Sequence, residues 1–264
     1  MEKSDYSVRE GFDRAAPVLY SECLTSTNSV LKRLAAAGAA SGTVLWAREQ
    51  TAGRGRLGRS FLSPEGGIYL SVLWRPGCPP EKTVSLTACA AAALCRWIEG
   101  YGLKPEIKWP NDVLLDGKKL SGILTEGFTA PDGGFSVVLG IGVNVNTESF
   151  PEELADTAVS LRMATGRIWE LDGLAGELIA QLDGMYRLWC AGPGAFLKEY
   201  RSRCTTTGHE VLLESGGLSI PARAVGINDD YSLAVETAGG ERRDVRFGEV
   251  SVRMQHLKKK KAML

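Results

Sequence analysis

The stretch Gln50–Phe61 reads QTAGRGRLGRSF and combines three glycines with three arginines, Arg54, Arg56 and Arg59. Glycine allows the main chain to approach a ligand closely. The arginine guanidinium is a planar fork of donors that matches phosphate or carboxylate oxygens. The whole chain has 31 basic and 31 acidic side chains, so no global field attracts anions. The stretch therefore predicts a local anion-binding loop.

Three further stretches have side chains suited to ligand binding: STN at 26–28, KWPND at 108–112 followed by KKLSGIL at 118–124, and GIGVNVN at 140–146. Each has an ordinary structural explanation when it is taken alone. They are consistent with a helix cap, a turn and hairpin, and a strand with a bulge or a close backbone approach. Their specificity lies in their combination and order along the chain with the glycine-arginine loop.

Taken together, the four stretches resemble the catalytic domain of biotin-protein ligases, of the monofunctional type that lacks an N-terminal DNA-binding domain. The resemblance covers about Leu19 to Arg253 and includes GEVS at 248–251. It implies activation of biotin by ATP to biotinyl-5′-AMP, with Mg²⁺ and with release of pyrophosphate. It also implies transfer of biotin to one lysine of the biotin carboxyl carrier domain of acetyl-CoA carboxylase or a related carboxylase.

The resemblance also assigns roles to individual positions. It implies that Arg54, Arg56 and Lys119 are catalytic and that Asp112 holds Mg²⁺. The implied biotin-binding positions are Ser26, Thr27, Asn28, Gln50, Gly53, Arg54, Gly55, Arg56, Trp109, Lys119, Gly122 and Leu124, with Ile141 as a further apolar wall. The implied nucleotide-binding positions are Arg54, Arg56, Arg59, Phe61, Lys108, Asn111, Lys119 and Asn144, the last of which reads adenine.

These residue types suit the implied reaction physically. A carboxylate and the α-phosphate of ATP repel each other until cations neutralise them, so catalysis is electrostatic and positional. In the family the loop closes over the acyl-adenylate, and Gly53, Gly55 and Gly58 would permit that closure, which shields the anhydride from water. Some members have tryptophan where this chain has Phe61, so we expect a changed nucleotide affinity with activity retained.

The periodicity of the sequence predicts the elements that hold these stretches. Residues after the STN cap predict a helix that ends at Gly38, and strands are expected within 43–50 and 66–76, on either side of the glycine-arginine loop. An alanine-rich helix is expected over 81–102, and three strands over 106–128 and 135–146, the first two joined at Asp116-Gly117. Further helices are expected over 151–165 and 172–191.

From Thr205 onward, short apolar runs broken by turns predict four or five strands of a small barrel. We therefore expect two domains: a catalytic domain over 1–204 and an SH3-like barrel with a basic tail over 205–264. By resemblance the catalytic domain is an α+β, class II synthetase-like fold, with a mixed sheet that has helices on one side. The tail Lys258–Lys261 is interpreted as a solvated chain end. The sequence leaves open whether the chain forms a homodimer.

Six cysteines without a C-x-x-C pair indicate reduced thiols, and no apolar run is long enough for a signal peptide or a membrane span. The sequence therefore predicts a cytoplasmic protein without membrane contact.

The motif of a Walker P-loop is incomplete, which disfavours a kinase or GTPase. Two histidines leave little material for a Ser-His-Asp triad or a zinc site. A lipoate or octanoate ligase is the alternative enzyme. A biotin-responsive DNA-binding regulator is disfavoured, because 25 residues before Ser26 are too few for a three-helix module, so no specific DNA binding is expected.

Overall fold

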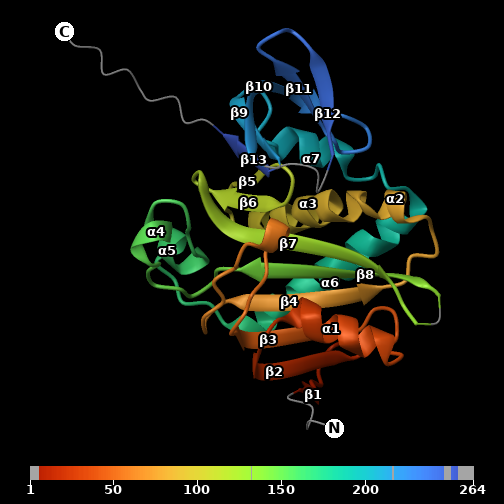
Figure 1. Ribbon diagram of the computed structural model, residues 1–264. Coiled ribbons are helices and arrows are strands. Elements are labelled where there is room, and N and C mark those ends of the chain that lie inside the picture. The colour runs from red at the N-terminus through yellow and green to blue at the C-terminus, as the bar shows by residue number, and fades with distance from the viewer. Residues whose placement is uncertain (1–5, 132, 216, 247–250, 255–264) are drawn as a thin grey trace.

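In the computed structural model, residues 6–131, 133–215, 217–246 and 251–254 are described. Their centre is an eight-stranded sheet with the order β1-β2-β3-β4-β8-β7-β6-β5 (Figure 1). The strands are β1 (Ser7–Val8), β2 (Val18–Leu24), β3 (Val44–Gln50), β4 (Ile68–Trp74), β5 (Pro105–Lys108), β6 (Asp112–Leu115), β7 (Lys118–Thr129) and β8 (Phe135–Val143). Strands β2 and β3 are parallel and all other neighbours are antiparallel. The predicted mixed sheet is confirmed.

Helices cover both faces of this sheet, so the expected one-sided arrangement is wrong. Helix α1 (Thr27–Ala36) packs on one face, where its Leu31 joins Leu73 of β4 in a small apolar cluster. Helices α3 (Ser85–Glu99) and α6 (Leu171–Ala191) pack on the other face, where Trp74 stacks on Tyr186 of α6 at 4.4 Å. The apolar residues of β4 point to both faces in alternation, which requires a helix on each.

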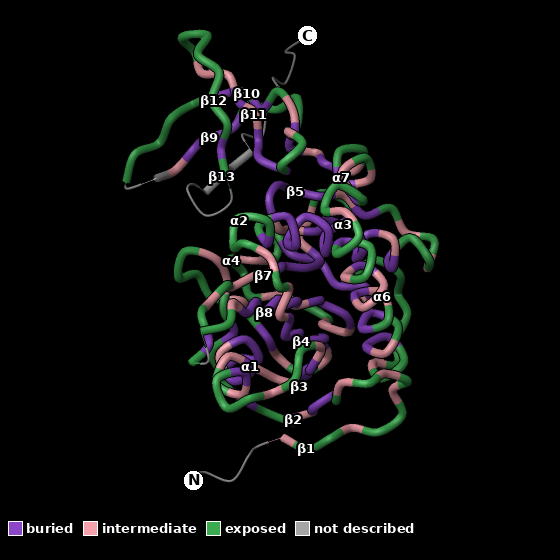
Figure 2. Tube along the Cα trace, turned by 90° about the vertical axis from the view of Figure 1, so that its right-hand side faces the viewer, coloured by how far each residue is buried: buried purple, intermediate pink, exposed green. Residues whose placement is uncertain are grey.

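The long helices follow their predicted patterns. All five residues of the α6 stripe (Leu174, Leu178, Leu182, Met185 and Trp189) are buried, as expected from their spacing. The alanine-rich helix is shorter than expected, because a separate turn, α2 (Pro80–Thr83), precedes α3. Helix α3 is buried on nearly all sides (Figure 2), and its small side chains allow close packing against the sheet and against α6.

Two other expectations need correction. The helix expected over 151–165 consists of two short helices, α4 (Glu152–Ala155) and α5 (Leu161–Thr165). The backbone between them bonds instead to the start of β7, with Thr157 and Val159 paired to the Lys119 backbone. The three strands expected over 106–146 are four, because β5 and β6 form a hairpin in which Lys108 faces Asp112. The turn at Asp116-Gly117 is confirmed, with positive φ at both residues.

The C-terminal part forms a five-stranded antiparallel sheet after helix α7 (Leu197–Arg203), in the order β12-β11-β10-β9-β13. Its strands are β9 (Glu210–Ser215), β10 (Leu218–Ile227), β11 (Leu233–Thr237), β12 (Arg242–Val245) and β13 (Ser251–Met254). The expected strand number is confirmed. The division of the chain at Cys204 stays a prediction. Most of the GEVS stretch (248–250) and the Lys258–Lys261 tail lie outside the described residues.

Within the described ranges, no helix combines the length and the apolar character needed to cross a bilayer.

The six cysteines are all free thiols. Cys89 and Cys95 lie on α3, where burial raises the pKa of each thiol to about 12. Because the thiolate is the reactive form, about one molecule in 10⁴ carries it at pH 8. Ellman's reagent at pH 8 should therefore react first with the exposed Cys23 and Cys190. Cys89 and Cys95 should react only in denaturant, and rapid labelling of either in the native protein would contradict this burial.

Candidate active site

The four predicted stretches lie around one cavity of about 130 Å³. It is formed by the start of α1, the loop between β3 and β4, the turn between β5 and β6, and the strands β7 and β8. The predicted residues that line it are Ser26, Thr27, Asn28, Gln50, Arg54, Gly55, Arg56, Arg59, Phe61, Asn111, Asp112, Lys119, Gly122, Leu124 and Ile141. Strands that are distant in sequence thus bring these side chains together.

A buried polar network forms the cavity wall at the start of α1. The Gln50 side-chain carbonyl accepts a hydrogen bond from the Thr27 backbone N–H at 2.8 Å, and its amide donates to Ser63. The Ser71 hydroxyl of β4 lies 2.7 Å from Thr27 Oγ1 and 2.6 Å from Asn28 Oδ1. Ser26 occupies the N-cap position of α1 but makes no capping bond with its side chain. Its hydroxyl is therefore available to a ligand.

Asn28 has a structural role in this wall. Its amide nitrogen donates to the Leu124 carbonyl at 3.2 Å and to the Glu126 carboxylate at 2.9 Å. Both amide hydrogens are therefore in use, and only a lone pair of Oδ1 remains for a ligand. Asn28 also lies so close to Gly140 that a Cβ there would be 2.0 Å from Asn28 Oδ1, which explains the need for glycine at that position.

Glu126 holds two of the residues that line the cavity, Asn28 and Arg54, and the sequence motifs did not identify it. Its carboxylate accepts from Asn28, from Lys32 at 3.0 Å and from Arg54 at 3.4 Å. Burial alone raises the pKa of Glu126, but the hydrogen bonds from Asn28 and Lys32 and the nearby charges outweigh it and hold this pKa below its usual value. The signal was present, because Gly122, Leu124 and Glu126 alternate along β7 and share one face.

The arginine loop folds over the cavity with each guanidinium near a protein acceptor. Arg54 lies 3.3 Å from Glu126, Arg59 lies 3.9 Å from Glu214 of β9, and Arg56 donates to the Asn111 side-chain oxygen at 3.3 Å. Burial lowers the pKa of Arg56 while the Asp112 carboxylate opposes this shift, and the guanidinium stays charged at neutral pH. The loop thus holds three cations beside the cavity.

Gly53 does not line the cavity, and its role in this loop is steric. A Cβ at Gly53 would lie 2.3 Å from the Phe61 carbonyl oxygen, across the base of the loop. The Gly53 carbonyl accepts from the Phe61 N–H at 2.9 Å, which closes that base. Gly53 was expected to permit loop closure, and in the structure its position also requires glycine for close packing.

Phe61 covers the apolar floor of the cavity, which is formed by Gly122, Leu124 and Ile141. Gly122 and Gly142 face each other across β7 and β8, and a Cβ on Gly142 would be 2.5 Å from the Phe61 ring. The ring therefore lies directly on the glycine backbone. Lys119 Nζ lies 5.5 Å from the centre of the same ring. The aromatic side chain therefore fills the space directly above the two glycines.

Lys119 and Asp112 form the charged pair of the site, with 2.8 Å between Nζ and Oδ1. The adjacent Asn111 is fixed by its side-chain amide, which donates to the Ile123 carbonyl at 2.8 Å. Asp112 is the single acidic side chain among the described residues that line the cavity. A cation and a carboxylate thus lie beside the arginine loop. An anionic ligand could bind the Lys119 ammonium in place of Asp112.

Three other predicted residues do not line the cavity. Trp109 is buried, and its indole N–H donates to the Tyr231 carbonyl at 3.0 Å, away from the apolar floor. The Asn144 amide donates to the backbone carbonyls of Lys119 and Val159. Lys108 lies at the end of β5, opposite Asp112 in register. Trp109 and Asn144 therefore support the strands and turns that carry other site residues.

Comparison with known proteins identifies the family of the chain. Residues 20–146 match the Biotin/lipoate A/B protein ligase family. The bifunctional ligase/repressor BirA of Bacillus spizizenii is 37% identical over 228 residues, which are 84% of this chain and 70% of the relative. A biotin--[acetyl-CoA-carboxylase] ligase of Mycobacterium tuberculosis is 35% identical over 222 residues, with 81% of each chain covered.

A solved structure is also similar over most of the chain. It is the biotin protein ligase from Aquifex aeolicus in complex with biotin and ATP, with a TM-score of 0.77 and 30% identity. The similarity covers 90% of this chain and 99% of the Aquifex chain. The resemblance inferred from the motifs is thereby confirmed: the chain belongs to the Biotin/lipoate A/B protein ligase family.

Proposed function

We propose that the chain is an ATP-dependent biotin protein ligase. It joins the biotin carboxylate to AMP with release of pyrophosphate, and then transfers biotin to a lysine of a carboxylase carrier domain. The observation that carries this proposal is the convergence of four polar stretches on one cavity that combines a polar wall, an apolar floor and four cations. The Mycobacterium relative is a biotin--[acetyl-CoA-carboxylase] ligase and the Aquifex structure contains biotin and ATP, which supports the same substrates here.

Biotin binding would use both ends of the cavity. The ureido ring needs paired donors and acceptors, and the Ser26 hydroxyl and the Thr27–Gln50 pair supply them at the polar wall. The apolar ring and chain would lie on the floor made by Gly122, Leu124 and Ile141. Ligand pockets commonly have about 300 Å³ or more, so Phe61 must move aside from Gly122 and Gly142 when biotin enters.

In the first step, an oxygen of the biotin carboxylate attacks the α-phosphorus of ATP. The new oxygen–phosphorus bond forms as the bond between the α-phosphorus and the bridging oxygen of pyrophosphate breaks. Arg54, Arg56 and Lys119 neutralise the two anions that approach each other, and Lys119 leaves Asp112 to do so. In the second step, the neutral amine of the acceptor lysine attacks the acyl carbon, AMP leaves and the amine loses a proton.

The donor set fits a magnesium ion that arrives with its nucleotide. Mg²⁺ is typically bound by one or two carboxylates together with substrate phosphates, and Asp112 with the Asn111 side chain beside it matches that pattern. Within the described part of the chain, no cluster of three or more His, Cys, Asp or Glu side chains forms a complete metal cage. When bound, the ion would neutralise phosphate charge.

Removal of the metal should abolish the first step. EDTA should stop biotin-dependent exchange of pyrophosphate into ATP, and excess Mg²⁺ should restore it. Asp112→Asn should raise the Mg²⁺ concentration for half-maximal exchange at least about tenfold, a loss typical for disturbed metal sites. Asp116→Asn is the matched control, because asparagine suits the positive φ of that turn residue. Equal Mg²⁺ requirements in both variants would contradict the assignment of Asp112.

The same exchange assay tests the substrate. Biotin at saturating MgATP should support incorporation of labelled pyrophosphate into ATP, and lipoate at equal concentration should not. Exchange that depends on lipoate and not on biotin would show that lipoate is the substrate.

The six free thiols support a reducing compartment such as the cytoplasm as the place where the enzyme acts.

A further inference from the structure

The turn that leads into Asn111 and Asp112 is held by hydrogen bonds to residues much later in the chain. The Trp109 backbone N–H donates to the Thr206 hydroxyl at 2.9 Å. The Tyr200 hydroxyl donates to the Pro110 carbonyl at 3.0 Å, and the Tyr231 carbonyl accepts from the Trp109 indole. All three partners come from α7 or the C-terminal part, about a hundred residues from the turn.

The Pro110 carbonyl is an informative point of attachment. It belongs to the peptide unit that leads into Asn111, so its hydrogen bond fixes the orientation of that peptide plane. On the opposite side, the Asn111 carbonyl accepts from the Ile123 N–H at 3.0 Å. The residue is therefore held between β7 and Tyr200. Loss of either attachment would let Asn111 and Asp112 shift within the site.

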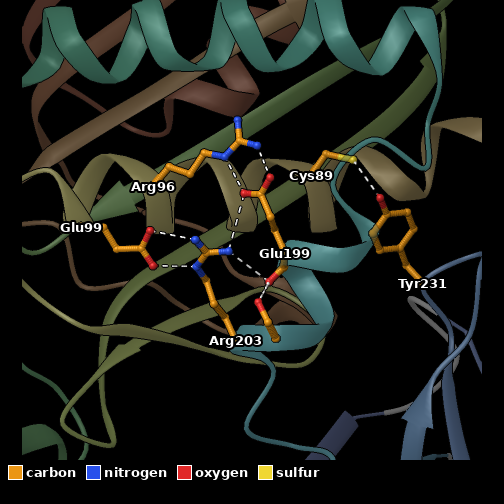
Figure 3. Close-up of polar contacts among 7 residues, drawn as sticks. Cys89, Arg96, Glu99, Glu199, Arg203 and Tyr231 are labelled. Carbon is orange, nitrogen blue, oxygen red and sulfur yellow. Dashed lines mark hydrogen bonds and ion pairs between the residues drawn. The ribbon is translucent and has the colours of Figure 1, made fainter.

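Tyr200 itself is held rigidly. It is fully buried, and its ring packs edge-on against Tyr231 with 5.6 Å between ring centres. Helix α7, which carries it, is fixed to α3 by alternating charges: Arg203 lies between Glu99 and Glu199, and Glu199 also pairs with Arg96 (Figure 3). Burial raises the pKa of Tyr200 well above its usual value, so the hydroxyl keeps the proton that it donates.

Tyr231 links the C-terminal sheet to the same framework. Its hydroxyl donates to the Pro193 carbonyl at 2.9 Å and lies 3.6 Å from Cys89 Sγ of α3 (Figure 3). It lies in the turn between β10 and β11, where its backbone has a φ of 65°. Tyr231 is thus anchored on α3 while its carbonyl contacts Trp109. The turn and α3 are connected through the C-terminal sheet.

We propose that Tyr200, together with the contact between Trp109 and the Tyr231 carbonyl, positions the 109–112 turn for use of MgATP. The proposal rests on the proposed function, and it adds a specific task for α7 and the C-terminal sheet in the first step. Tyr200, Trp109 and Tyr231 do not line the cavity. They act through Asn111 and Asp112, so their loss should affect the nucleotide and leave biotin binding intact.

Tyr200→Phe tests this role because it removes one hydroxyl and retains the ring. The change leaves the buried Pro110 carbonyl without its donor, a loss that corresponds to a factor of about five or more in an equilibrium constant. We expect the KM for MgATP in pyrophosphate exchange to rise about five- to tenfold, with the KM for biotin changed less than twofold. Tyr101→Phe is the control, since its hydroxyl bonds to Glu177 on α6, away from the turn. It should leave both KM values unchanged.

A second variant separates the positioning role of Trp109 from a role in the biotin pocket. Trp109→Phe removes the indole N–H that contacts Tyr231, and it should raise the KM for MgATP. A selective rise in the KM for biotin would instead place Trp109 in the biotin wall and overturn its part of the proposal.

The remaining outcomes are also decisive. An unchanged KM for MgATP in Tyr200→Phe, or equal rises for both substrates, would refute positioning. If the unmodified protein shows no biotin-dependent exchange, the proposed function fails, and positioning is then judged by calorimetric affinity for MgATP. A weaker affinity in Tyr200→Phe than in Tyr101→Phe would still support it. Absence of MgATP binding in the unmodified protein would overturn both proposals.

Discussion

Lys119→Ala is expected to lower biotin-dependent pyrophosphate exchange by about two to three orders of magnitude, the loss typical when one donor to a developing charge is removed. Lys119 is the cation of β7 that lines the cavity, and its ammonium lies 2.8 Å from Asp112. Without it, the carboxylate of biotin and the α-phosphate would meet with less neutralisation. The change should appear mainly in kcat, because the cation acts most strongly as the two anions approach.

Lys118→Ala is the matched control for this variant. Lys118 is the neighbouring residue on β7, but its ammonium donates to the Ala155 carbonyl at 3.0 Å and does not line the cavity. Its exchange rate should stay close to that of the unmodified protein. Melting temperatures of both variants identify any loss caused by unfolding. An undiminished rate in folded Lys119→Ala would refute its catalytic assignment.

Arg56→Gly is expected to release biotinyl-AMP from the site. Arg56 is the second of the three arginines of the loop and donates to Asn111, so it connects the loop to the turn that carries Asp112. Loss of a charge-assisted hydrogen bond costs about 1.5–3 kcal/mol, which corresponds to roughly ten- to hundredfold faster escape of the adenylate. The free anhydride would then acylate lysines of unrelated proteins.

Labelling of a bystander protein measures this escape. The variant should biotinylate serum albumin in the presence of biotin and MgATP, while the unmodified protein should not. Arg167→Gly is the control, because Arg167 lies in an exposed loop against Trp169 and outside the cavity. Target selectivity that stays unchanged in Arg56→Gly would count against its part in retaining the intermediate.

Local patterns predicted much of the fold. The strands on either side of the arginine loop, the α6 stripe and the hairpin turn at Asp116-Gly117 all depend on neighbours within a few residues. The expected helix over 151–165 failed, because a long-range backbone pairing with Lys119 competes with helix formation there. The side of the sheet on which α1 packs also depends on distant strands, so the sequence periodicity of α1 alone could not specify it.

The site was predicted more completely by resemblance than by chemistry. Motif order identified most of the residues that line the cavity, but it assigned Trp109 to the biotin wall, and the structure places its indole against Tyr231. It also missed Glu126, whose partners Asn28, Lys32 and Arg54 converge only after folding. The short motifs thus identified residues that line the cavity better than residues that orient them.

The central claim is that this cavity makes a reactive biotin adenylate and passes it to a single acceptor lysine. Mass spectrometry of a carboxylase carrier domain after incubation with the protein, biotin and MgATP tests it most directly. We predict a mass increase of one biotin, located on one lysine and absent when ATP is omitted. A carrier of unchanged mass, with a folded protein and all substrates present, would contradict the account.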